Sequence, residues 1–157
     1  MSTHPSATSP SPTSLGEPRW FFGMLAQVKA SAAATGGQYT LVEITAPPGL
    51  RAPRHVHYTE DEGFYVLEGS VTVEVGDETI ELAAGQYALG PRDIPHRFTV
   101  GPVGARMLWV LTPGGFEELV EEASVPAETP TVPPQSVVPP ADVADIVRRH
   151  GNEVLPD

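Results

Sequence analysis

The sequence contains no cysteine and few positive charges, and each shortage excludes classes of protein. Without cysteine the chain can form neither a disulfide scaffold nor a metal site built on thiolates. Nine lysines and arginines stand against 20 aspartates and glutamates, which gives a formal net charge of −11. Nucleic acids and anionic membrane surfaces are recognised by basic faces, so we expect no nucleic-acid partner and no membrane partner.

Long hydrophobic runs are also missing. None approaches the roughly 18 apolar residues of a membrane span. Residues 1–18 lack the basic and apolar regions of a secretory signal, so we expect a cytoplasmic protein. The same residues are mostly Ser, Thr and Pro with little apolar surface to bury, which predicts a disordered N-terminal arm.

The rest of the chain carries short β-forming runs separated by turns rich in glycine and proline. With 157 residues and 40% hydrophobic content, one core is expected. The runs occupy residues 38–46, 63–67, 70–75, 78–82, 86–89, 96–100 and 106–111. Gly76 and Asp77 separate two of them, which is typical of a two-residue hairpin. The pattern predicts an all-β sandwich or barrel within residues 19–124.

The segments around these runs are less regular. The apolar stretch RWFFGMLAQVKA at 19–30 is a first strand or a lid, and the small residues 31–37 read as a loop. Residues 116–123 predict a short helix that buries Phe116, Leu119 and Val120 and exposes its acidic residues to solvent.

The C-terminal third has a different composition. Prolines recur through residues 125–140, which we interpret as an extended connector. Residues 141–157 carry a last short helix that ends before Gly151, followed by a tail. Val143, Ile146 and Val147 share one face of that helix, so we expect it to pack on the barrel or on a partner subunit.

The segment RHVHYTEDEG at 54–63 has the residue types of a metal site. Alternate residues of a strand point to the same face, so His55 and His57 can bind one cation together. Glu60, Asp61 and Glu62 are all possible carboxylate ligands. If 58–61 form the turn before the next apolar run, Glu62 begins the returning strand opposite the histidines, and Glu60 and Asp61 remain in a solvated turn.

A third histidine, His96, follows Pro95 at the start of another alternating run. Three imidazoles and one carboxylate suit a divalent transition metal, namely Fe, Mn, Ni, Co or Zn, with positions left for water or substrate. We therefore expect one such ion per chain, held by His55, His57, Glu62 and His96.

The spacing of these residues resembles the two motifs of the cupin superfamily. Gly49, His55-x-His57, Glu62 and Gly69 reproduce the first motif without a mismatch. The second is matched by Gly85, Pro91 and His96, with fifteen residues between the motifs. It departs from the family in two positions, since Asp93 stands for the usual glycine and Val100 for a frequent asparagine. Neither position is a metal ligand, and an aspartate can adopt the left-handed conformation.

This resemblance, together with the flanking segments, implies a single-domain jelly-roll β-barrel with short C-terminal helices, similar to bacterial quercetin-dioxygenase-like monocupins. It further implies a metal-dependent dioxygenase of the quercetin 2,3-dioxygenase (flavonol 2,4-dioxygenase) type, using O₂ and a flavonol-like or other enolisable aromatic substrate. A non-oxidative polyketide cyclase, isomerase or lyase is the alternative, and a non-catalytic small-molecule-binding cupin is a further one. A homodimer is also implied, and the apolar residues 20–25 and the last helix are candidates for its interface.

In this interpretation Glu62 is both a metal ligand and the base that takes the substrate proton. The residues with a possible role in substrate binding are Tyr58, Phe64, Phe98, Met107 and Trp109. The apolar members of this set can equally fill the barrel core, and Tyr58 can be a residue of the rim. Arg51 and Arg54 can steer an anion or pair with the many carboxylates of the chain.

Overall fold

The computed structural model describes residues 16–157, so most of the predicted disordered arm lies outside the described residues. This part of the chain is predominantly β-structure with three short helices. The strands are β1 (Arg19–Phe21), β2 (Met24–Ala30), β3 (Thr40–Ala46), β4 (His55–His57), β5 (Asp61–Val75), β6 (Glu78–Ala83), β7 (Tyr87–Gly90), β8 (His96–Thr112), β9 (Val125–Pro126) and β10 (Asn152–Val154). The helices are α1 (Ala32–Thr35), α2 (Phe116–Glu122) and α3 (Val143–Arg149).

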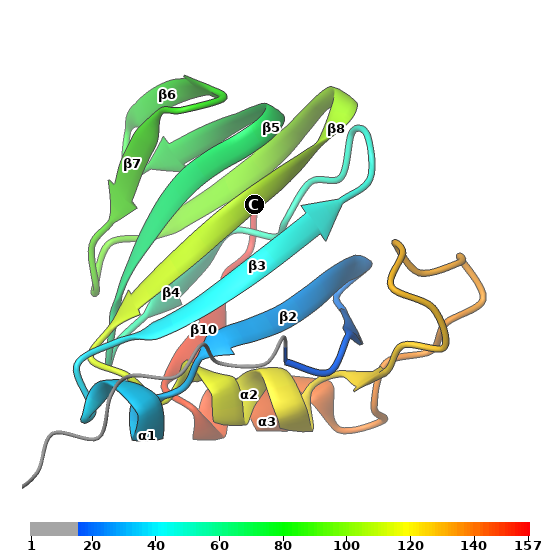
Figure 1. Cartoon of the computed structure of the whole chain (residues 1–157). Coiled ribbons are helices and arrows are strands. Elements are labelled where there is room, and N and C mark those ends of the chain that lie inside the picture. The colour runs from blue at the N-terminus through cyan, green and yellow to red at the C-terminus, as the bar shows by residue number, and fades with distance from the viewer. Residues whose placement is uncertain (1–15) are drawn as a thin grey trace, which may run out of the picture.

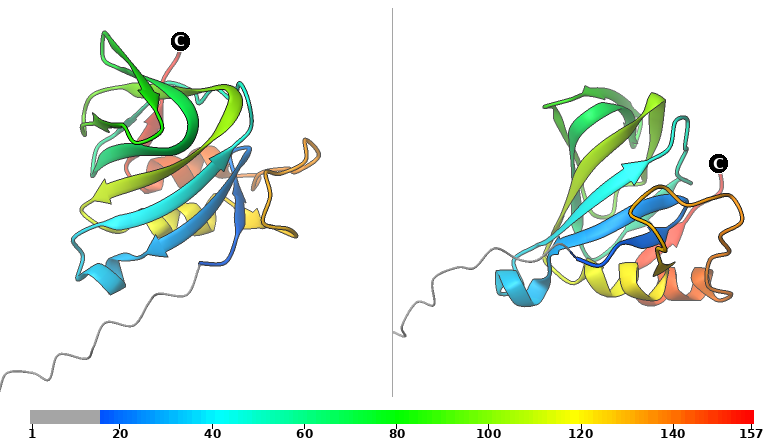
Figure 2. Two further views of the ribbon diagram at one scale, coloured as in Figure 1. Left: turned by 45° about the horizontal axis from the view of Figure 1, so that its top comes forward. Right: turned by 45° about the vertical axis from the view of Figure 1, so that its right-hand side comes forward.

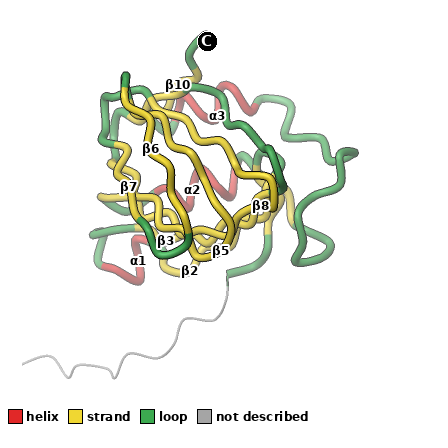
Figure 3. Tube along the Cα trace, turned by 90° about the horizontal axis from the view of Figure 1, so that it is seen from above, coloured by secondary structure: helices red, strands yellow, loops and turns green. Residues whose placement is uncertain are grey.

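All strands belong to one antiparallel sheet that curls around the core, as Figure 1 and the view from above in Figure 3 show. One path of neighbours runs β10-β4-β8-β3-β2-β1-β9, and β5 joins it by pairing with β8 and carries β6 and β7. Alternate residues of β3 are buried, as expected for a strand with one face toward a core. The all-β barrel expected from the sequence is confirmed.

Two strands are longer than the sequence pattern indicates. The runs 63–67 and 70–75 are one continuous strand, β5, and the runs 96–100 and 106–111 are one strand, β8. Between the two runs, the register of β5 against β8 shifts on both sides of Gly69. Gly69 has a φ of 76°, a conformation that glycine adopts readily and other residues rarely do. The glycine therefore bends the strand where the sequence predicts that it ends.

The predicted hairpin is confirmed, because Val75 pairs with Glu78 across Gly76 and Asp77. The stretch 19–30 forms two strands, β1 and β2, that pair with each other. It is therefore part of the sheet.

The predicted loop at 31–37 contains the single-turn helix α1 instead. Ser31 caps it by accepting a hydrogen bond from the Ala34 amide, and Gly36 ends it with a φ of 63°. The capping residues on both sides explain why a run of small residues forms a helical turn here.

Helices α2 and α3 lie side by side at one end of the sheet, as both views of Figure 2 show. The predicted apolar face of α2 is confirmed, since Phe116, Leu119 and Val120 are buried. The acidic face is only partly solvated, because the Glu117 carboxylate accepts hydrogen bonds from the Ala32 and Gly115 amides. The Glu117 side chain therefore ties α2 to the first residue of α1.

Helix α3 packs on its own chain, with Ile146 and Val147 buried. The residues after it form β10, which pairs with β4 and was not expected from the sequence. The proline-rich connector also begins with a short strand, β9, which pairs with β1. Both ends of the C-terminal segment are thus tied into the sheet.

The residues proposed for a dimer interface are mostly buried inside the chain. Trp20, Phe21, Met24 and Leu25 are at most 9% exposed, and Phe22 is the one large side chain of this stretch that is exposed, at 44%. The prediction that residues 20–25 and α3 form the dimer interface is therefore wrong, although the homodimer itself stays a prediction. Within the described residues, no helix is long and apolar enough to cross a bilayer.

Candidate metal centre

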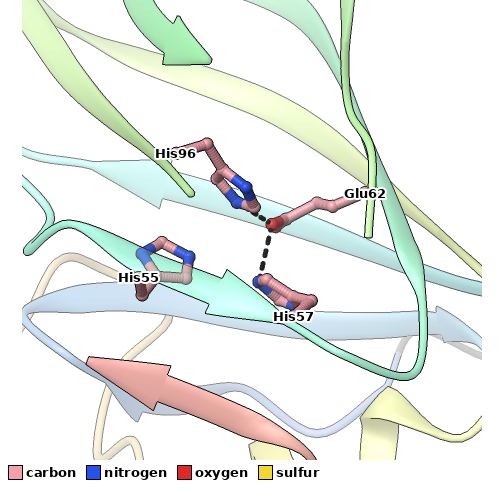
Figure 4. A group of neighbouring side chains, drawn as sticks. All are labelled: His55, His57, Glu62 and His96. Carbon is pink, nitrogen blue, oxygen red and sulfur yellow. Dashed lines mark hydrogen bonds and ion pairs between the residues drawn. The ribbon is translucent and has the colours of Figure 1, made fainter. Parts of the chain in front are cut away.

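Three neighbouring strands carry the predicted ligands. β4 supplies His55 and His57, β5 supplies Glu62 from its second residue, and β8 begins with His96, which pairs with His55. Figure 4 shows the four side chains converging on one space, with the Glu62 carboxylate between His57 and His96. The strand alternation and the turn before β5 thus bring together residues 41 positions apart in the chain.

The donor atoms are close enough for one ion. One nitrogen or oxygen of each side chain lies within 4.8 Å of the others. Glu62 Oε2 is 2.9 Å from His96 Nε2 and 3.1 Å from His57 Nε2. The buried His57 Nε2 has no hydrogen bond among the described residues. A buried nitrogen facing two imidazoles and a carboxylate matches the donor set of a divalent transition metal.

The electrostatics make Glu62 an anion and His55 a neutral donor. Burial alone raises the pKa of Glu62, but the charge of His57 and contacts with both buried histidines outweigh it and hold the pKa well below its usual range. Burial, together with the electrostatic influence of the neighbouring His96 ring, lowers the pKa of His55 to about 4. A neutral imidazole has the free electron pair that a metal needs.

His57 behaves differently. Burial disfavours its charged form, yet the Glu62 charge, the hydrogen bond with Glu60 and the close ion-pair contact with Glu62 outweigh burial and raise its pKa to about 9. Both ring nitrogens of His57 therefore carry a proton at neutral pH when no cation is present. A metal has to displace one of these protons before His57 can ligate it.

The three histidines differ at the ring nitrogen that points away from the centre, where two have a partner and His96 has none among the described residues. His55 Nδ1 lies 2.8 Å from the Pro53 carbonyl oxygen, and His57 Nδ1 lies 2.9 Å from Glu60 Oε1. His96 Nδ1 is buried and has no partner in the described chain. A partner on Nδ1 keeps the proton there and leaves Nε2 free to ligate.

Glu60 therefore corrects one expectation. It does not lie in a solvated turn but is 7% exposed, with its Oε2 accepting a hydrogen bond from Thr59 and its Oε1 facing His57. Asn152 of β10 lies over it, with Nδ2 3.5 Å from Oε1. Asp61 does lie at the surface, paired with Arg92. The spacing His-x-x-Glu was a visible signal for Glu60, whereas β10 left no pattern in the sequence.

The second motif places His96 despite its departures from the family. Asp93 adopts a φ of 68°, the left-handed conformation expected where glycine is usual, and its amide donates to the His57 carbonyl at 2.8 Å. Gly90 lies beside the ring of His96, where an added Cβ would come within 3.1 Å of Nδ1. A bare backbone at Gly90 therefore leaves room for the ligand ring.

The cluster opens onto a cavity with about 730 Å³ of empty space, mouth included, bordered by His55, His57 and Glu62. Its wall is mostly apolar and aromatic. The aromatic lining residues are Phe21, Phe22, Phe98, Trp109 and Phe116. Val147, Asn152 and Val154 line it from α3 and β10, so the C-terminal segment forms one side of the cavity.

The residues predicted to bind substrate divide into two groups. Phe98 and Trp109 line the cavity. Phe64 and Met107 are completely buried in the core and do not line it. Tyr58 is also not among the lining residues, because its side chain is 49% exposed and its hydroxyl donates to Glu153 at 2.6 Å. Strand alternation predicts which side chains point inward. It does not predict which of these border the cavity and which lie in the core.

Comparison with known proteins agrees with this geometry. The cupin domain family matches residues 42–111, which include all four converging residues. A quercetin 2,3-dioxygenase of Bacillus subtilis (strain 168) is 31% identical over 104 residues, covering 66% of this chain and 31% of that protein. The polyketide synthase CurC of Streptomyces cyaneus is 42% identical over 67 residues, covering 42% of this chain and 44% of that protein.

A solved structure shares the fold. KdgF from Halomonas sp. aligns with a TM-score of 0.55 at 19% identity, covering 61% of this chain and 84% of that one. The chain belongs to the cupin superfamily, and its barrel is a cupin jelly roll. It is similar to quercetin 2,3-dioxygenases, although it spans only about a third of the length of the Bacillus protein.

Proposed function

We propose that the protein is a metal-dependent oxidoreductase, a dioxygenase that acts on a flavonol-like or other enolisable aromatic substrate. The observation that carries the proposal is a cluster of three histidines and one glutamate at the side of an aromatic-lined cavity. Similarity to a quercetin 2,3-dioxygenase supports the same reaction class.

In this proposal His55, His57, Glu62 and His96 hold one divalent ion, which is Fe, Mn, Ni, Co or Zn. The ion supplies positive charge that favours an enolate over its neutral parent and a centre that can orient O₂. The apolar wall, with Phe98 and Trp109, holds the aromatic rings and excludes water from them.

Glu62 is the base in this scheme. Its carboxylate is ionised, opens onto the cavity and is held on one side by His57 and His96. It can therefore accept the proton of a substrate hydroxyl. An amide in its place keeps the shape and loses this ability.

The test is oxygen uptake by protein reloaded in turn with each of the redox-active metals, with 3-hydroxyflavone as substrate. We expect uptake together with loss of the flavonol absorption band. Glu62→Gln should retain part of the metal and lose at least about a hundredfold in turnover, within the range of general-base contributions. Glu68→Gln, at an exposed site on the same strand, is the matched control and should keep full activity. A fully active Glu62→Gln protein would exclude the base role.

The second candidate is a non-oxidative metal cupin, a polyketide cyclase, isomerase or lyase. The similarity to polyketide synthase CurC favours it. The same oxygen electrode separates the two, because product formed under strict anaerobiosis belongs to the non-oxidative class. A Zn-loaded protein that is active without O₂ would point the same way, since Zn(II) has no redox chemistry.

A further inference from the structure

Two arginines of this acidic chain, Arg51 and Arg54, have no side-chain partner among the described residues, and both lie in one loop. All nine lysines and arginines fall within the described residues. Seven of them contact a carboxylate or another acceptor, namely Arg19, Lys29, Arg92, Arg97, Arg106, Arg148 and Arg149. Within residues 16–157, Arg51 and Arg54 have no ion pair and no side-chain hydrogen bond, and residues 1–15 contain no Asp or Glu.

Only one of these two arginines reaches the cavity. The loop 47–54 leads from β3 into β4, and Arg51 in it lines the cavity that His55, His57 and Glu62 also border. The Arg51 backbone is anchored by a bridge to Thr99 of β8. Arg54, three residues further on, is not among the lining residues.

Arg51 is also chemically distinct within the lining. Among the described residues that border the cavity, the other charged or titratable ones are those of the metal cluster. Two further polar groups border it, the Asn152 amide and the buried indole N–H of Trp109. A guanidinium is always charged and has five donors suited to a carboxylate or another planar anion. In a chain with a net charge of −11, an arginine without a carboxylate partner is available for a ligand.

We propose that Arg51 binds an anionic group of the substrate, so that the substrate is an aromatic molecule with a carboxylate or similar anion in addition to its metal-binding oxygen. This inference rests on the proposed function, which places the reacting oxygen of the substrate at the metal cluster. It goes beyond that function in assigning charge to the substrate. It also accounts for how an acidic protein attracts an acidic ligand, because the local cation offsets the repulsion of the whole chain.

The first experiment uses metal-free protein, so that a carboxylate cannot bind the ion. The probes are 2-naphthoate and 2-naphthamide, which have the same shape and differ in charge, with binding followed by calorimetry. We expect wild type to prefer the carboxylate by about two- to fivefold, the range for an exposed ion pair. Arg51→Gln should lose this preference while keeping its affinity for the amide, and Arg51→Lys should keep part of it.

Arg54→Gln is the matched control, because it removes the same charge from the same loop away from the cavity. It should retain the preference of wild type. Absence of any preference in wild type, survival of the preference in Arg51→Gln, or equal loss in both variants would overturn the inference.

The second experiment repeats the comparison on metal-loaded protein with 4′-carboxy-3-hydroxyflavone and its 4′-carboxamide. An Arg51-dependent preference accompanied by oxygen uptake supports both proposals. An Arg51-dependent preference without turnover discards the dioxygenase and keeps the role of Arg51. Turnover that is equal for both flavonols in wild type and in Arg51→Gln keeps the dioxygenase and overturns the inference.

Discussion

Glu60 distinguishes His57 from the two other histidines of the cluster. A carboxylate on Nδ1 fixes the tautomer and the ring orientation of His57, whereas His55 has a backbone carbonyl and His96 has no partner among the described residues. The three imidazoles therefore differ in how firmly they are held. His57 is the ring whose support can be removed by one side-chain substitution.

We predict that Glu60→Leu weakens metal binding by about ten- to a hundredfold, the usual effect of losing such an outer partner. Glu60→Gln should lose less, because its amide oxygen can still accept the Nδ1 proton. Competition with a chromophoric chelator measures the affinities. Asp61→Asn, which alters the neighbouring surface carboxylate, should bind metal like wild type. Equal affinities for Glu60→Leu and wild type would show that His57 needs no such support.

A second prediction at this scale concerns pH. Because the pKa of His57 is raised to about 9 in the metal-free protein, its proton competes with the metal below that pH. Apparent affinity should therefore rise with pH and level off above about 9. Calorimetry at pH 7.5 in two buffers of different ionisation enthalpy should report release of about one proton per metal. No proton release at this pH would contradict the raised pKa.

The ligand residues could be read from the sequence, and their supporting residues could not. Alternation along a strand places His55 and His57 on one face without any knowledge of the rest of the fold. The burial of Glu60 depends on the conformation of the turn 58–60 and on Asn152, which lies 92 residues further along the chain. Turn conformation and distant packing are not encoded in local periodicity.

Among the elements, α3 and β10 add a C-terminal side to the barrel. α3 buries Ile146 and Val147 against the core, and β10 hydrogen-bonds to the strand that carries two of the candidate ligands. These elements total ten residues but form part of the cavity wall. Their packing should therefore contribute to the stability of the whole domain.

We predict that Ile146→Ala lowers the free energy of unfolding by about 2 kcal/mol or more, since it removes a buried side chain that neighbours cannot replace. Urea unfolding followed by circular dichroism measures the change. Val138→Ala, at a position 76% exposed in the connector, is the control and should change stability by less than about 0.5 kcal/mol. Equal stability of the two variants would mean that α3 is not part of the cooperative unit.

An element could be predicted where its own consecutive residues show a clear pattern. The hairpin at Gly76 and the face of α2 each follow from a few consecutive residues. β10 has three residues, too few to show a period, and is specified only by its pairing with β4. β5 and β8 appeared interrupted because glycines mark both a bulge and a turn in sequence.

At the scale of the molecule, one group of exposed apolar residues lies outside the segments that the sequence suggested for a dimer interface. Tyr65 and Tyr87 are paired across β5 and β7, and Leu89 lies two residues along β7 on the same face. All three are 38–55% exposed. This face is where a second copy could bury apolar surface.

We retain the prediction of a homodimer and locate it on this face. Light scattering at micromolar concentration should give about twice the chain mass of 16.7 kDa. Tyr87→Lys should shift the protein toward the monomer, while Tyr39→Lys, at a similarly exposed tyrosine outside this face, should not. A mass near that of one chain for wild type would refute the dimer.

Strand β10 also has a consequence for synthesis of the protein. The Tyr58 amide beside the ligand strand donates to Gly151, and the Tyr58 hydroxyl reaches Glu153, 95 residues further along the chain. A ribosome makes His55, His57, Glu62 and His96 long before it makes this strand. During translation the four side chains can approach one another while the outer edge of β4 is still unpaired. Full closure of the centre therefore waits until the last described strand has left the ribosome, and a cation captured earlier would occupy a site with one side open.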